Sequence, residues 1–147
     1  MRDFANEGEV YRFLRWKLRE LWGARVEERY GLGRLSPDVD LLVVAGGGVF
    51  GLEVKYFQDR PLRAYEGLGE ALALLLYCFD GVYLVHVFDS SLRGVYGEVV
   101  ERALRLVDLT PLGYVVVVGR GDPEVLRVPR GNPFKLRGEC EAVGQDA

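Results

Sequence analysis

The feature that most constrains the fold of this chain is a pair of apolar, strand-like runs separated by three glycines. The runs are DLLVVA at residues 40–45 and VFGLEVKYF at residues 49–57, with Gly46, Gly47 and Gly48 between them. Two runs rich in β-branched and aromatic residues around a tight glycine turn are typical of a β-hairpin. Because both runs are strongly apolar, we expect both strands to be buried in a sheet.

The rest of the chain alternates helical and strand patterns. Apolar residues recur at three- and four-residue steps over residues 9–22, which predicts an amphipathic helix before the hairpin. The remaining predicted elements are a short strand over 24–30, a helix over 63–79, a strand over 82–88, a helix over 96–107, a strand over 114–118 and an edge strand over 124–128. The order αβββαβαβ indicates an α/β fold, with a mixed central sheet flanked by helices.

Length and composition favour one globular domain. The chain has 147 residues, of which 49% are hydrophobic and 28% are charged, and this balance argues against disorder. We interpret residues 1–129 as a single domain. Residues 130–147 show no periodicity, so we expect them to form a mobile C-terminal tail.

The N-terminus is too charged for a signal peptide, and no apolar run is long enough to span a membrane. We therefore expect a cytoplasmic protein without a membrane partner. Cys78 and Cys140 are far apart and have no metal-binding spacing, which excludes a disulfide framework or a zinc knuckle. A single bond between them remains an open alternative.

The acidic balance of the chain limits how it can meet nucleic acid. A net charge of −3 argues against a protein that coats nucleic acid with positive charge, so any phosphate contact must be local. Candidates for such contacts are Arg12 on the first helix, Arg34 in the glycine-rich loop, and Arg60 and Arg63 after the second hairpin strand.

The hairpin carries a group of charges that indicates a metal site. Side chains alternate along a strand, so Glu53 and Lys55 point to the same face, and the hairpin turn can bring Asp40 opposite Glu53. Two carboxylates held close together repel each other unless a cation lies between them, and such hard oxygen ligands favour Mg²⁺ or Mn²⁺. Lys55 could then orient or deprotonate a water and offset charge on a phosphate.

Simpler interpretations of the same residues stay open. Glu53 and Lys55 could form an ordinary surface ion pair, although an acid and a lysine in an apolar strand more often mark a site. Asp38 follows Pro37 and could serve only the turn, or it could join Asp40 as a second ligand.

Taken together, Pro37, Asp38, Asp40 and the Glu53-Val54-Lys55 triplet resemble the signature of the PD-(D/E)xK superfamily of restriction-endonuclease-like nucleases. The resemblance implies a core of helix, three-strand meander, helix and strand, and Mg²⁺-dependent hydrolysis of DNA. It also implies a glutamate on the first helix near the metal, for which Glu9 is the candidate and Glu7 the competitor. In its small size and its EVK triplet, the chain is most similar to archaeal Holliday junction resolvase-like endonucleases.

Two other functions are compatible with the same sequence. A non-catalytic interaction or scaffold module could keep the nuclease-like fold, and an RNA endonuclease would use the same phosphate chemistry. Because one small domain offers little surface for a duplex, we expect a homodimer that uses the apolar helix over 71–79 or the aromatic C-terminal region.

Overall fold

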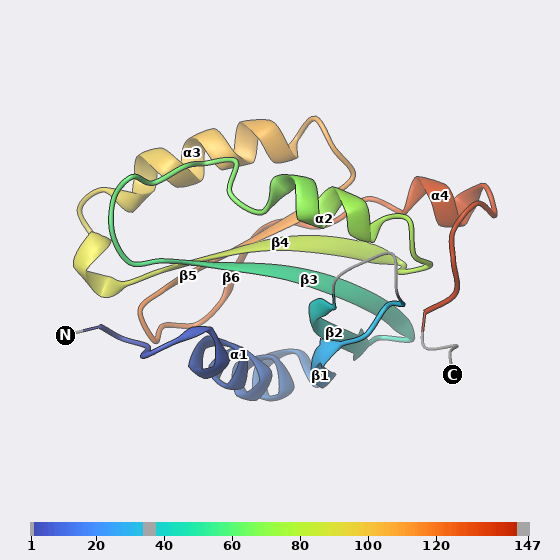
Figure 1. Cartoon of the computed structure of the whole chain (residues 1–147), viewed down its shortest axis with the longest axis horizontal. Helices are drawn as coiled ribbons and strands as arrows, with labels where there is room; N and C mark the ends of the chain where they lie inside the picture. Colours follow the sequence, from blue (N-terminus) through green and yellow to red (C-terminus); the bar gives the residue numbers. More distant parts are fainter. Residues whose placement is uncertain (1, 34–37, 144–147) are drawn as a thin grey trace.

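The computed structural model describes residues 2–33 and 38–143 (Figure 1). Its elements, in chain order, are α1 (Glu7–Trp22), β1 (Arg25–Tyr30), β2 (Val39–Ala45), β3 (Gly48–Phe57), α2 (Leu68–Leu74), β4 (Gly81–Phe88), the 3₁₀ turn η1 (Ser90–Leu92), α3 (Tyr96–Val107), β5 (Gly113–Val118), β6 (Glu124–Arg127) and α4 (Pro133–Leu136).

The strands form one six-stranded sheet in the order β1-β2-β3-β4-β5-β6. The first three strands are an antiparallel meander, β3, β4 and β5 run parallel, and β6 returns antiparallel to β5. Helices α2 and α3 provide the crossovers that parallel neighbours require. The structure thereby confirms the predicted α/β class, the mixed sheet and the order αβββαβαβ.

Apolar side chains fill both faces of the sheet. On one face α1 packs Val10, Leu14 and Leu18 against the sheet, and on the other face Ala71 of α2 and Ala103 of α3 are fully covered. Figure 1 shows this layering, with α1 on one side of the strands and α2 and α3 on the other. Burial on two faces explains why the central strands are almost continuously apolar. No helix among the described residues is both long and apolar enough to cross a bilayer.

Helix α2 is shorter than the helix predicted over 63–79. Gly67 precedes it in a left-handed conformation (φ 81°), and a Cβ there would lie 2.9 Å from Lys55 Cγ. A glycine therefore fits where the chain passes close to β3, and the helix begins only at Leu68. At the other end, the carbonyls of Leu75, Tyr77 and Phe79 are held from outside the helix rather than by it.

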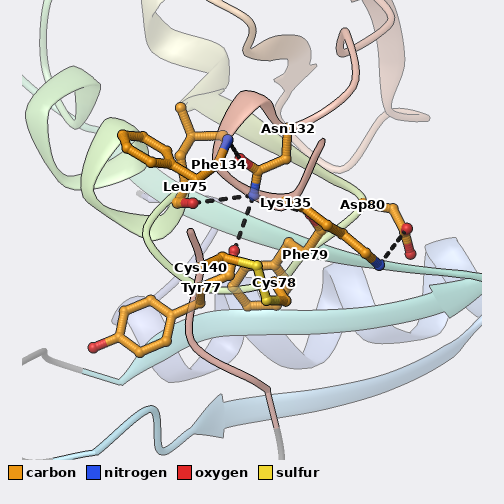
Figure 2. Close-up of a disulfide and its surroundings, with 9 residues drawn as sticks. All are labelled: Leu75, Tyr77, Cys78, Phe79, Asp80, Asn132, Phe134, Lys135 and Cys140. Atoms are coloured by element: carbon orange, nitrogen blue, oxygen red, sulfur yellow. Dashed lines mark hydrogen bonds and ion pairs between the residues drawn. A yellow bond between two sulfur atoms is a disulfide. The ribbon is translucent and has the colours of Figure 1, made fainter. Parts of the chain in front are cut away.

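The group that holds these carbonyls is the side chain of Asn132. Its buried amide donates to all three, at 3.0, 2.9 and 3.0 Å, and Figure 2 shows the amide nitrogen pointing toward the segment between α2 and β4. Cys140 forms a disulfide with Cys78 beside this contact. This is the single bond that the sequence analysis kept as an alternative. Residues 130–143 thus contain α4 and pack against the domain, unlike the tail without regular structure expected from the sequence.

The Asn132 contact gives a testable consequence for stability. We expect Asn132→Ala to lower the free energy of unfolding by about 2–3 kcal/mol, because it leaves buried carbonyls without a donor. Lys135→Ala is the control, since it removes only an exposed ion pair with Asp80 and should cost under about 1 kcal/mol. Urea unfolding followed by circular dichroism measures both, and equal losses in the two variants would contradict this role of Asn132.

Candidate active site

The β2–β3 hairpin brings Asp40, Glu53 and Lys55 together. Leu41 pairs with Leu52 in the antiparallel register, and the next position along places Asp40 opposite Glu53. Asp40 Oδ2 accepts a hydrogen bond of 2.7 Å from the Val54 amide, which fixes this carboxylate against β3. Lys55 Nζ lies 3.6 Å from Glu53 Oε2. The structure therefore places these three predicted residues in one cluster.

Burial makes the two carboxylates a strained pair. Glu53 is only 6% exposed, and this burial, followed by the charges of Asp40 and Glu70, raises its pKa to about 8. Burial also raises the pKa of Asp40, although hydrogen bonds from the Val54 amide and Tyr11 act in the opposite direction. Removing this cost requires a bound proton or a cation between the two groups.

Lys55 is held as an ammonium by its surroundings. Partial burial lowers its pKa, but the hydrogen bond to Glu70 at 3.0 Å and the charges of Glu53 and Glu70 raise it by more. A lysine with a raised pKa is a poor base. Of the two roles expected from the sequence, the contacts therefore favour orienting a group and offsetting negative charge over deprotonating water.

Helix α1 contributes Tyr11 and Glu7 to the site. Tyr11 is buried beside Asp40, and burial, then the charges of Asp40 and Glu7, raise the pKa of its hydroxyl. Glu7 also raises the pKa of Asp40. Since residues four apart share one face of a helix, Glu7 and Tyr11 both lie toward the hairpin.

Glu9, the helix glutamate favoured from the sequence, lies elsewhere. Its Oε1 accepts from the Ala5 amide at 3.1 Å and lies 3.5 Å from Arg120 Nη2. Two helical positions separate it from Glu7, a rotation of about 200°, so the two glutamates face nearly opposite ways. Of the two candidate helix glutamates, the structure therefore places Glu7 near Asp40 and Glu9 beside Arg120.

Arg29 is a residue that sequence analysis missed. Its guanidinium lies 5.3 Å from the centre of the Tyr11 ring, and its backbone is left-handed (φ 52°), a conformation that costs a non-glycine residue free energy. Position 29 follows Glu28, which pairs with Leu41, so it lies next to Asp40 in the register. The surrounding sequence RVEERY contains no motif that singles out this arginine.

The other predicted residues are not brought to the cluster. Asp38 is exposed just before β2 and forms no hydrogen bond or ion pair with the part of the chain that the structure describes. Arg12 lies with Glu9 on another face of α1. Arg60 and Arg63 lie beside α3, and Arg34 falls outside the described residues.

The donor set suits a hard divalent cation that keeps part of its own water shell. Two close carboxylates with raised pKa values gain from a positive charge between them, and Mg²⁺ commonly uses one or two carboxylates with waters and a substrate phosphate. Within residues 2–33 and 38–143, no three His, Cys, Asp or Glu side chains are arranged to hold a metal. The residues that fit the ion are therefore the pair Asp40 and Glu53.

Comparison with known proteins adds a shared fold. The chain matches no family model, and no curated protein matches it in sequence. A protein of unknown function from Silicibacter pomeroyi, SPO1766, is similar in structure with a TM-score of 0.55 and 17% identity, over 87% of this chain and 76% of that one. Pyrococcus furiosus SfsA, solved in complex with Ca²⁺, gives a TM-score of 0.39 and 17% identity, over 81% and 59%. The likeness to SPO1766 shows a common fold and nothing about activity.

The raised pKa of Glu53 predicts how stability depends on pH. Folding raises this pKa from 4.5 to about 8, so ionisation of Glu53 destabilises the native state progressively as pH rises through that window. Glu53→Gln should therefore become more stable than the wild type by a few kcal/mol at about pH 9, with a smaller difference at about pH 5.

The control for this measurement is Glu101→Gln, because Glu101 is exposed on α3. We expect its unfolding free energy to follow that of the wild type at every pH. An equal pH dependence in the wild type and in Glu53→Gln, measured by urea unfolding, would show that Glu53 is not under this strain.

Proposed function

We propose that this protein is a metal-dependent nuclease that hydrolyses phosphodiester bonds in DNA, as the resemblance to PD-(D/E)xK enzymes implies. The observation that carries the proposal is the cluster itself, in which Asp40 meets Glu53 on adjoining strands and Lys55 Nζ lies 3.6 Å from Glu53. Membership of that superfamily, the preference for DNA and the homodimer are parts of the proposal.

Each residue has a role that follows from its contacts. Asp40 and Glu53 would hold Mg²⁺ or Mn²⁺, which when bound lowers the pKa of water and offsets charge on a phosphate. Lys55, kept as an ammonium by Glu70, would stabilise the negative charge that builds on the phosphate during attack. The Val54 amide orients Asp40, and Tyr11 and Glu7 of α1 lie on the same side, where Glu7 adds negative charge.

The cost of the cluster supports this proposal over a non-catalytic scaffold. A scaffold gains nothing from a buried and a half-buried carboxylate whose pKa values are raised, and apolar residues at these positions would stabilise the sheet better. A metal site needs those groups in that place, so the strain has a use only when a cation binds.

Metal binding is the first test. We expect Mn²⁺ to give a saturable heat in isothermal titration calorimetry with the wild-type protein and to raise its melting temperature. Asp40→Asn and Glu53→Gln should each lose most of that heat, whereas Glu101→Gln should keep it. Heat that is absent from the wild type, or unchanged in both site variants, would contradict the proposed metal site.

Cleavage is the second test. With Mg²⁺ or Mn²⁺, the wild type should cut at least one of single-stranded, duplex and four-way-junction DNA, and Lys55→Ala should lower the rate by about 100-fold or more because it removes charge stabilisation. Lys17→Ala is the control, since Lys17 pairs with Asp122 away from the cluster. Cutting confined to RNA would support the RNA endonuclease, and cutting unaffected by Lys55→Ala would contradict the assigned site.

A further inference from the structure

Four arginines gather beside α3, on the sheet face that also carries Lys55. Arg60 and Arg63 come from the segment after β3, and Arg102 and Arg105 come from α3. They surround two adjoining cavities of about 360 and 700 Å³, which share Leu62, Ala64 and Arg102 in their walls. We name this region the arginine surface.

The charges of the arginine surface are not neutralised within the described part of the chain. All four side chains are exposed, and none of their guanidinium groups forms an ion pair or hydrogen bond there. Asp59, the neighbour of Arg60, is paired with Arg2 at 2.6 Å. Glu98 lines the smaller cavity one helical turn before Arg102, yet the two form no ion pair. In a chain with a net charge of −3, this is a local positive surface that fits a polyanion.

Apolar side chains lie among these charges. Tyr65 is 59% exposed and Leu109 is 83% exposed, and both line the larger cavity with Arg63, Arg102 and Arg105. An exposed aromatic ring between guanidinium groups can stack a base while the arginines contact phosphates. Only an unpaired base presents its face for such stacking, so this combination favours a single strand over a closed duplex.

The arginine surface adjoins the candidate active site along the chain. The carbonyl of Glu66 accepts a hydrogen bond of 2.8 Å from His86 Nε2, which fixes the segment that follows Tyr65. Gly67 comes next and packs against the side chain of Lys55. Tyr65 is therefore only two residues from Gly67, which contacts Lys55. A nucleic-acid strand stacked on Tyr65 would lie next to the candidate active site.

We propose that the arginine surface binds single-stranded nucleic acid, with Arg60, Arg63, Arg102 and Arg105 on its phosphates and Tyr65 stacked on a base. The choice of nucleic acid as the polyanion rests on the proposed function. The surface makes the preferred substrate a nucleic acid with an unpaired segment next to the scissile bond.

Fluorescence anisotropy of a labelled oligothymidylate of about ten nucleotides tests this in EDTA, where no cleavage occurs. Arg102→Ala/Arg105→Ala should weaken binding about tenfold or more and reduce the salt slope by about 1.4, as loss of two phosphate contacts requires. Tyr65→Ala should weaken binding about fivefold or more, and Tyr65→Phe should restore it. A duplex of the same length should bind more weakly and should not respond to Tyr65→Ala.

The matched control is Arg15→Ala/Arg19→Ala, which removes two exposed arginines from α1 on the other face of the sheet. It should leave binding within about twofold of the wild type. Equal losses in both double variants would show binding by general charge and overturn the proposal. A loss in Arg102→Ala/Arg105→Ala with no effect of Tyr65→Ala would overturn the single-strand assignment.

The same experiment separates this proposal from the nuclease itself. Wild-type protein that binds the oligonucleotide as described, but with Mn²⁺ cuts none of single-stranded, duplex and four-way-junction DNA or RNA, would retain the arginine surface and refute the nuclease. Protein that cuts with Mn²⁺, but whose binding is unchanged in Arg102→Ala/Arg105→Ala, would retain the nuclease and refute the arginine surface.

Discussion

The candidate site depends on two carboxylates, Asp40 and Glu53, whose charged forms are destabilised by their position in the sheet. Asp40 and Glu53 meet because β2 and β3 form a hairpin, and Glu53 is nearly covered by the elements around it. Burial and mutual repulsion raise the pKa of Glu53 to about 8, so the pair carries less than its full charge near neutral pH. Such a pair destabilises the native fold, and a cation bound between the two carboxylates would remove that cost.

Different neighbouring groups hold Asp40 and Lys55 in place. The Val54 amide fixes Asp40, Tyr11 covers it from α1, and Glu70 keeps Lys55 charged beside Glu53. These partners come from α1, β3 and α2, so three elements must be in place before the cluster has its geometry. The site is consequently a property of the folded sheet and not of the hairpin alone.

The central cluster was predictable because it rests on the two-residue period of strands and a short turn. That period places Glu53 and Lys55 on one face and Asp40 opposite Glu53, without any knowledge of distant contacts. The choice between Glu7 and Glu9 was not predictable, because it depends on how α1 is rotated against the sheet. Arg29 gave no signal, since its place next to Asp40 follows from the register of β1 against β2.

The ends of α2 show the same limit. Apolar periodicity extends over residues 63–79, but close approach at Gly67 and capture of three carbonyls by Asn132 confine the helix to Leu68–Leu74. The partners in these two contacts, Lys55 and Asn132, lie far from the helix in sequence. The C-terminal segment had no pattern of its own, because its order comes from Asn132 and Cys140 meeting the turn before β4.

The central claim is that Asp40 and Glu53 bind one divalent cation between them, and a crystal soaked in Mn²⁺ tests it most directly. The account predicts an anomalous peak within coordination distance of carboxylate oxygens from both residues, with Lys55 still beside Glu53. Saturating Mn²⁺ with no peak at this position, or a peak bound only by exposed carboxylates elsewhere, would contradict it.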